Sequence, residues 1–190
     1  MKYTLIGSRE VPKHIETLQE GLGYALASKG IHGVSGAALG SDTNFLAGYC
    51  KYAIQHNRPL NFTSYIPWDY FKDSCVKELK RRGLWREDFD LHFVVVGNSV
   101  RATGIARGIH PNWDRCSKGA KALHARNVYQ ILGGGVDTAV DKVVCYAKEV
   151  NGEVKGGTRT AVVLAKQYDV PVSNLFNEET RLKAERWLGR

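Results

Sequence analysis

The feature that most limits the possible folds is an alternation of short apolar segments with longer amphipathic ones in the first third of the chain. Residues 3–6, 31–34 and 60–65 are apolar and have the length of strands. Residues 12–28 and 43–56 lie between them and carry apolar side chains at helical spacing. Short connections between strands and helices predict a parallel sheet with helices on both faces. We therefore expect an α/β protein with a doubly wound, mainly parallel sheet.

The rest of the chain continues this pattern less regularly. Strands are expected at residues 93–96, 142–147 and 170–175, and helices at residues 99–109, 115–132 and 178–188. Residues 66–91 are rich in aromatic side chains and depart from the alternation, so we expect a helical, aromatic insert there. Since no repeat or linker divides the sequence, residues 1–190 are expected to form one domain.

Three glycine-containing loops follow predicted strands. They cover residues 7–9, 35–42 and 156–158, and the last of them opens a helix with Thr158 as its expected cap. The first amides of a helix lack partners within the helix and can bind an anion such as phosphate. Because the carboxyl ends of parallel strands meet at one edge, we expect the loops to converge on one phosphate-bearing ligand. The expected phosphate contacts are Gly7, Ser8, Arg9, Gly156, Gly157 and Thr158.

Small residues in the second loop leave two interpretations open. Ser35, Gly36 and Ala37 allow a base or ribose to approach the backbone, or they allow a helix to pack tightly on a strand. Asp42 either caps the next helix or accepts a hydrogen bond from a ribose or base.

A further group of polar and aromatic residues precedes and enters the helix at 115–132. Trp113 could stack on a base or close the core, and Arg126 could meet a phosphate or form a structural ion pair. Cleavage of an N-glycosidic bond would require a carboxylate near the anomeric carbon. The candidates for that catalytic role are Asp42 and Asp114.

Composition favours an anionic partner. The net charge is +8 and the pI is about 9.4, which suits nucleic acid or nucleotides, although a solvated basic surface would have the same composition. No apolar run is long enough to cross a membrane and the N-terminal segment reads as a strand, so a cytoplasmic protein is expected. The four cysteines form no CxxC pair, and we therefore expect reduced thiols, no metal site and no cofactor.

Several of these motifs resemble those of known proteins. Residues 5–9 and 34–42 resemble the strand exit and glycine loop of the DprA/Smf family, and Arg126-Asn127 resembles a segment of that family. Residues 156–158 with residues 170–175 resemble the closing unit of the SLOG superfamily, which includes the LOG phosphoribohydrolases. The combination of residues 66–68, 110–113, 124–127 and 156–158 resembles compact DprA-like proteins that are often encoded by bacteriophages.

The resemblance implies a Rossmann-like fold that binds nucleotides or nucleic acid, with Asn127 added to the expected site. It also implies single-stranded DNA as the partner, a role in DNA processing and a possible homodimer, in the host cytoplasm if the protein is viral. Two alternatives remain open: an enzyme that cleaves or transfers at an N-glycosidic bond, and a viral protein that sequesters a nucleotide signal of host immunity.

Overall fold

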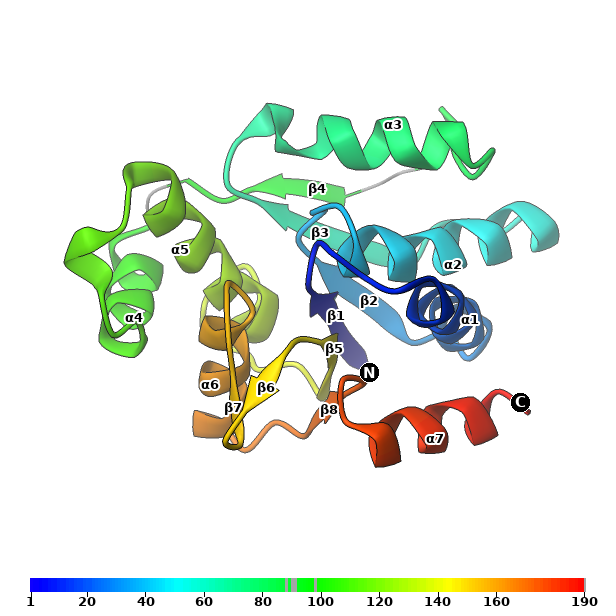
Figure 1. Ribbon diagram of the computed structural model, residues 1–190. Helices are drawn as coiled ribbons and strands as arrows, with labels where there is room; N and C mark the ends of the chain where they lie inside the picture. Colours follow the sequence, from blue (N-terminus) through cyan, green and yellow to red (C-terminus); the bar gives the residue numbers. More distant parts are fainter. Residues whose placement is uncertain (88, 90–91, 98, 190) are drawn as a thin grey trace.

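Six parallel strands form the central sheet of this computed structural model, which describes residues 1–87, 89, 92–97 and 99–189 (Figure 1). The strands are β1 (Lys2–Gly7), β2 (His32–Ser35), β3 (Phe62–Ile66), β4 (His92–Val95), β5 (Lys142–Tyr146) and β8 (Val172–Asn174). Their order across the sheet is β4-β3-β2-β1-β5-β8, and every neighbouring pair is parallel. The predicted α/β class with a mainly parallel sheet is confirmed.

Helices cover both faces of this sheet (Figure 1). The helices of one face are α1 (Lys13–Ser28), α2 (Ser41–His56), α3 (Asp73–Arg81) and α7 (Glu178–Trp187), and those of the other are α4 (Val100–Ile109), α5 (Lys118–Leu132) and α6 (Arg159–Gln167). Neighbouring side chains of a strand point to opposite faces, so Leu5 of β1 belongs to the first hydrophobic core and Ile6 to the second. This two-sided arrangement confirms the doubly wound, Rossmann-like fold.

The strand order reverses between β1 and β5. The chain proceeds from β1 to β2, β3 and β4 in one direction, and then returns to place β5 and β8 on the other side of β1. Gly7 at the end of β1 lies opposite Tyr146 at the end of β5. In doubly wound sheets a crevice opens at such a switch point, outside the carboxyl ends of the strands.

The segment expected as an insert, residues 66–91, is the crossover between β3 and β4. A short 3-10 helix, Asp69–Lys72, leads into α3, and the chain then enters the edge strand β4. Residues 88, 90 and 91 of that expected segment lie outside the described residues.

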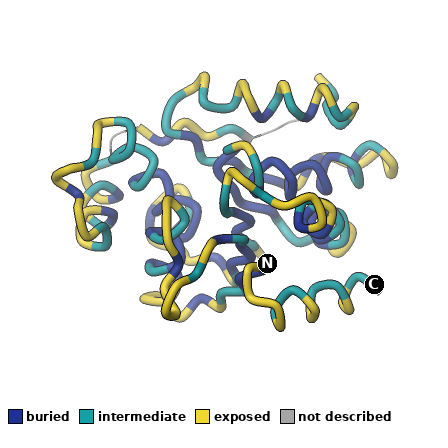
Figure 2. Tube along the Cα trace, viewed as in Figure 1, coloured by how far each residue is buried: buried dark blue, intermediate teal, exposed yellow. Residues whose placement is uncertain are grey.

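A small antiparallel hairpin joins β5 to α6. Strands β6 (Glu149–Val150) and β7 (Glu153–Val154) pair across a turn in which Asn151 and Gly152 have positive φ values of 53° and 76°. Asn-Gly is the preferred pair for such a two-residue turn. The turn stands out as exposed chain beside the buried sheet (Figure 2). In the described part of the chain, every helix is too short or too polar to cross a membrane.

Candidate functional site

A cleft of about 560 Å³ lies at the carboxyl edge of the sheet, where the chain crosses from one half to the other. The expected site residues that line it are Gly7, Ser8, Arg9, Asp42, Arg126, Asn127, Gly156, Gly157 and Thr158. The first and third glycine loops therefore meet in one cleft, together with Asp42 and Ala38 from the second. Ser35, Gly36 and Ala37 of the second loop, as well as Trp113 and Asp114, do not line it.

The buried carboxylate of Asp42 links the first and second glycine loops by hydrogen bonds. Its Oδ1 accepts a hydrogen bond from the amide of Gly7 at 3.3 Å, and its Oδ2 accepts from the amides of Gly36 at 3.1 Å and Ala38 at 3.4 Å. The expectation that Asp42 caps the following helix is wrong. Helix α2 already begins at Ser41, after Gly40, and the Asp42 carboxylate turns back toward the loops.

Arg126 is the buried counter-ion of Asp42. Its Nη1 lies 3.7 Å from Oδ2 of Asp42, and only 6% of Arg126 and 3% of Asp42 are exposed. The Gln130 amide oxygen, in the orientation that satisfies its neighbours, accepts from Nη1 at 2.8 Å. Burial raises the pKa of the Asp42 carboxyl, and the positive charge of Arg126 and the loop amides oppose that rise. Burial likewise lowers the pKa of Arg126, and Asp42 opposes that change.

The small residues of the second loop serve packing. Ser35 Oγ donates to the carbonyl of Leu5 at 2.6 Å, and Ser35 and Ala37 are at most 2% exposed. A Cβ on Gly36 would lie 1.0 Å from Nη1 of Arg126. Of the two interpretations left open for residues 35–37, these contacts agree with tight packing.

The loop at residues 156–158 differs from the second loop because its glycines are exposed and not tightly packed. Gly156 and Gly157 are exposed, and a Cβ on either would meet no described atom within 4 Å. Gly156 has a φ of +77°, which other residues rarely adopt. Asn127 fixes the loop, because its Nδ2 donates to the carbonyl of Gly157 at 2.8 Å. Thr158 precedes α6 as expected, but its side chain makes no capping hydrogen bond.

Positively charged side chains line the same cleft as this exposed loop. Arg9 is exposed at the exit of β1, and Lys148 and Lys155 flank the β6–β7 hairpin on the other side of the cleft. Lys155 also pairs with Glu153 at 3.0 Å. Sequence reasoning did not assign either lysine to the site. It also missed Gln130, which follows Arg126 by about one helical turn and therefore shares its face of α5.

His124 of α5 also lines the cleft. Burial lowers its pKa most, and together with the nearby His110 and Arg126 brings it to about 4. Its Nδ1 lies 2.8 Å from Oγ1 of Thr160 on α6. The imidazole is therefore neutral at neutral pH.

Trp113 and Asp114 lie away from the cleft lining. Trp113 is 8% exposed and belongs to the hydrophobic core on the α4–α5–α6 face, so its ring is not available to stack on a base. The Asp114 side chain is 86% exposed and lies 3.9 Å from Arg107. Because its indole is buried, Trp113 is not placed as the expected stacking residue. Because its side chain is exposed to solvent away from the cleft lining, Asp114 is not placed as the expected catalytic carboxylate.

Comparisons with solved structures agree with this architecture. DNA processing protein A from Helicobacter pylori, which is described as binding single-stranded DNA in a unique mode, superposes with a TM-score of 0.52 at 20% identity. The fold is DprA-like. The likeness covers 90% of this chain and 63% of the H. pylori protein.

DprA from Streptococcus pneumoniae is similar over 90% of this chain and 48% of its own, with a TM-score of 0.48 and 16% identity. The chain thus spans less than two thirds of either DprA structure. No protein-family model and no curated protein matches the sequence.

Proposed function

We propose that this protein binds single-stranded DNA through its phosphates, in a DNA-processing role, at the cleft beside the β1–β5 switch point. The observation that carries the proposal is the open loop at Gly156 and Gly157, which starts α6 and shares one cleft with Arg9. Exposed backbone at a helix start together with a guanidinium is the chemistry that holds a phosphate. Gly7, Ser8, Asn127 and Thr158 complete the proposed contact surface.

Charge supports a polyanionic ligand. The chain carries a net charge of +8, and Arg9, Lys148 and Lys155 all line the cleft. A single strand that tracks such a groove releases counterions as its phosphates are neutralised. The similarity to H. pylori DNA processing protein A, which binds single-stranded DNA, agrees with this ligand.

The buried Asp42–Arg126 pair favours binding over N-glycosidic chemistry. Asp42 is engaged by three backbone amides and Arg126, and Asp114 lies elsewhere. These contacts support a structural role for Asp42 over stabilisation of an oxocarbenium-like centre. In this proposal Asp42 and Arg126 hold the loops in place and do not contact the ligand directly.

A second candidate is a single nucleotide that is held and released unaltered, as in the sequestration of a nucleotide signal. The size of the cleft favours it, since about 560 Å³ falls within the range of small-molecule sites. The two candidates differ in the number of phosphates contacted, and therefore in the salt dependence of the affinity.

Fluorescence anisotropy of a labelled single-stranded oligonucleotide separates these candidates. The protein is titrated at several salt concentrations, with mononucleotides as competitors. DNA binding predicts that log K falls with log salt by about 0.7 per neutralised phosphate, and that mononucleotides barely displace the strand. Full displacement by one mononucleotide, recovered intact, would favour the second candidate, and its release as free base would favour an enzyme.

Two charge-changing variants locate the site. Arg9→Glu and Gly157→Asp should each weaken binding about tenfold or more, because each places a negative charge beside a phosphate. The matched controls are Arg58→Glu, on the opposite edge of the sheet before β3, and Gly104→Asp, on an exposed position of α4 where a side chain meets no described atom within 4 Å. Unchanged affinity in both folded site variants would refute the proposed location.

A further inference from the structure

We propose that His110, Cys116 and His124 bind one divalent cation of the zinc class. The metal-binding atoms of these three side chains all lie within 4.8 Å of one another. They come from three separate places: the residue after α4, the residue after the 3-10 helix Trp113–Arg115, and the middle of α5. Among the described residues, no other group of histidine, cysteine and acidic side chains meets the same criterion.

The distances are close to those of a tetrahedral site. Cys116 Sγ lies 3.7 Å from Nδ1 and 3.8 Å from Nε2 of His110. Zinc bonds of about 2.0–2.3 Å at tetrahedral angles separate two ligand atoms by roughly 3.3–3.8 Å. The Cys116–His110 pair therefore already has the required separation, and the widest pair must close by about 1 Å on binding. The centroids of the two imidazole rings lie 4.4 Å apart.

A second, independent observation is the anchoring of His124. Its Nδ1 lies 2.8 Å from Oγ1 of Thr160, a residue that is only 1% exposed. Histidines that bind a metal through one ring nitrogen usually hold the other nitrogen in such a hydrogen bond, which fixes the orientation of the ring. Thr160 thus leaves Nε2 of His124 as the metal-binding nitrogen.

The donor set selects the type of metal. Two imidazoles and a thiolate suit zinc or another borderline transition ion, and they do not suit Mg²⁺ or Ca²⁺, which prefer oxygen ligands. Three protein ligands leave one of four tetrahedral positions for water or another ligand. Because His110 and Cys116 lie at the ends of two short helices, the cation would also fasten the turn between α4 and α5.

The ligand spacing explains why the sequence alone predicts no metal. His110, Cys116 and His124 are separated by five and seven residues, and neither gap matches a CxxC clip or an HxxxH helix pair. The 3-10 helix reverses the chain after α4 and brings Cys116 back to His110. The site therefore depends on tertiary structure and not on a local motif.

The test is a titration of the purified, metal-free protein with Co²⁺ and Zn²⁺. One equivalent of Co²⁺ should produce d–d bands of a tetrahedral site and a near-ultraviolet thiolate-to-cobalt charge-transfer band, and Zn²⁺ should abolish both. Zn²⁺ should also raise the melting temperature. Cys116→Ser and His110→Asn should each remove the charge-transfer band or weaken zinc binding by about tenfold or more.

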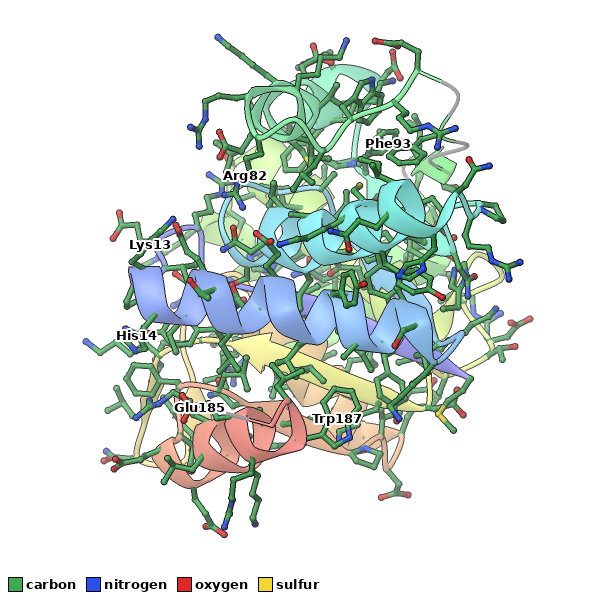
Figure 3. All side chains as sticks on the ribbon, turned by 90° about the vertical axis from the view of Figure 1, so that its right-hand side faces the viewer. Lys13, His14, Arg82, Phe93, Glu185 and Trp187 are labelled. Atoms are coloured by element: carbon green, nitrogen blue, oxygen red, sulfur yellow. The ribbon has the colours of Figure 1, made fainter. Side chains whose placement is uncertain are left out.

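Matched controls keep these results interpretable. Cys145→Ala removes a thiol that is buried in β5, where burial raises the pKa of this thiol to about 12. His14→Asn removes an exposed imidazole on α1 (Figure 3). Both controls should bind Co²⁺ like the parent. The circular dichroism of Cys116→Ser should match that of the parent, which separates ligand loss from unfolding. Absence of the cobalt bands in the parent protein, or a thiolate band that persists in Cys116→Ser, would overturn the proposal.

Discussion

The guanidinium of Arg126 occupies the space that a side chain on Gly36 would fill. A Cβ at Gly36 would lie 1.0 Å from Nη1 and 2.3 Å from Cζ of Arg126. Gly36 itself donates its amide to Asp42, the counter-ion of Arg126. Gly36, which the sequence offers as a ligand contact, is therefore required by the packing of the buried Asp42–Arg126 ion pair.

The substitution Gly36→Ala should destabilise the protein by about 3 kcal/mol, because the new methyl group displaces a buried, paired cation. Urea denaturation measures this loss. Gly157→Ala is the matched control, since its Cβ meets no described atom within 4 Å, and its effect should stay within about 0.5 kcal/mol. Equal stability of the two variants would contradict the packing described for Gly36.

Removal of both partners of the buried ion pair should cost less than the sum of the two single removals. Asp42→Asn leaves Arg126 buried beside a neutral amide, and we expect a loss of about 3–4 kcal/mol. Arg126→Met should show a similar loss, and the double variant should lose less than the sum. A double-mutant cycle by chemical denaturation measures the coupling, and strict additivity would show that the two charges do not interact.

The hydrogen bond between Asn127 and Gly157 should matter for ligand binding more than for stability. Asn127→Ala releases the carbonyl of Gly157, and we expect the affinity for single-stranded DNA to fall about three- to tenfold. Asn177→Ala is a suitable control. Asn177 caps α7, where its side chain accepts from the amide of Thr180, so this variant loses a hydrogen bond of similar strength away from the cleft. Equal affinity of the two variants would count against a role for the loop in binding.

Acid should weaken the junction between α3 and α2. Glu78 accepts hydrogen bonds from Arg81 and Arg82, and these bonds lower its pKa to about 2. Arg82 also donates to Oδ1 of Asn44 on α2 at 3.0 Å, and Figure 3 shows it between the helices. Because the pKa of Glu78 is lower in the folded state than the usual 4.5, its contribution is present above pH 4.5 and disappears as pH falls through about 2.

The pH dependence can be measured with Glu78→Gln. Above pH 5 the variant should be less stable than the parent by about 1 kcal/mol, a value reduced by the partial solvent exposure of the pair. The two unfolding free energies should converge as the pH approaches 2. A difference that stays constant over this range would mean that the charge of Glu78 contributes nothing.

Local sequence patterns predicted most of the fold and part of the site. Apolar runs and helical periodicity located the strands and helices. The rule that loops after parallel strands meet at one edge predicted that Arg9 and Gly157 share one cleft. The role of Asp42 could not be predicted in this way, because an aspartate before an amphipathic helix is usually a cap. Its actual partners are distant in sequence or structure: the end of β1, the loop after β2, and Arg126 on α5. Trp113 was ambiguous because only tertiary packing decides whether an indole is buried.

The expected homodimer, the assignment to phages and the ligand contacts remain predictions. The last of these are tested by the variants proposed above. Size-exclusion chromatography with light scattering measures the oligomeric state directly.

The strand pairing at the switch point links ligand binding to folding of the whole chain. Tyr3 in β1 pairs with Lys142 in β5, so the two walls of the cleft come together only after distant parts of the chain have met. The site therefore forms only when these two strands pair. A ligand that binds there reversibly stabilises the folded state at the centre of the sheet. At a hundred times its dissociation constant such a ligand adds about 2.7 kcal/mol to the free energy of unfolding. Its resistance to proteolysis and heat should accordingly rise with the logarithm of the ligand concentration once that concentration exceeds the dissociation constant.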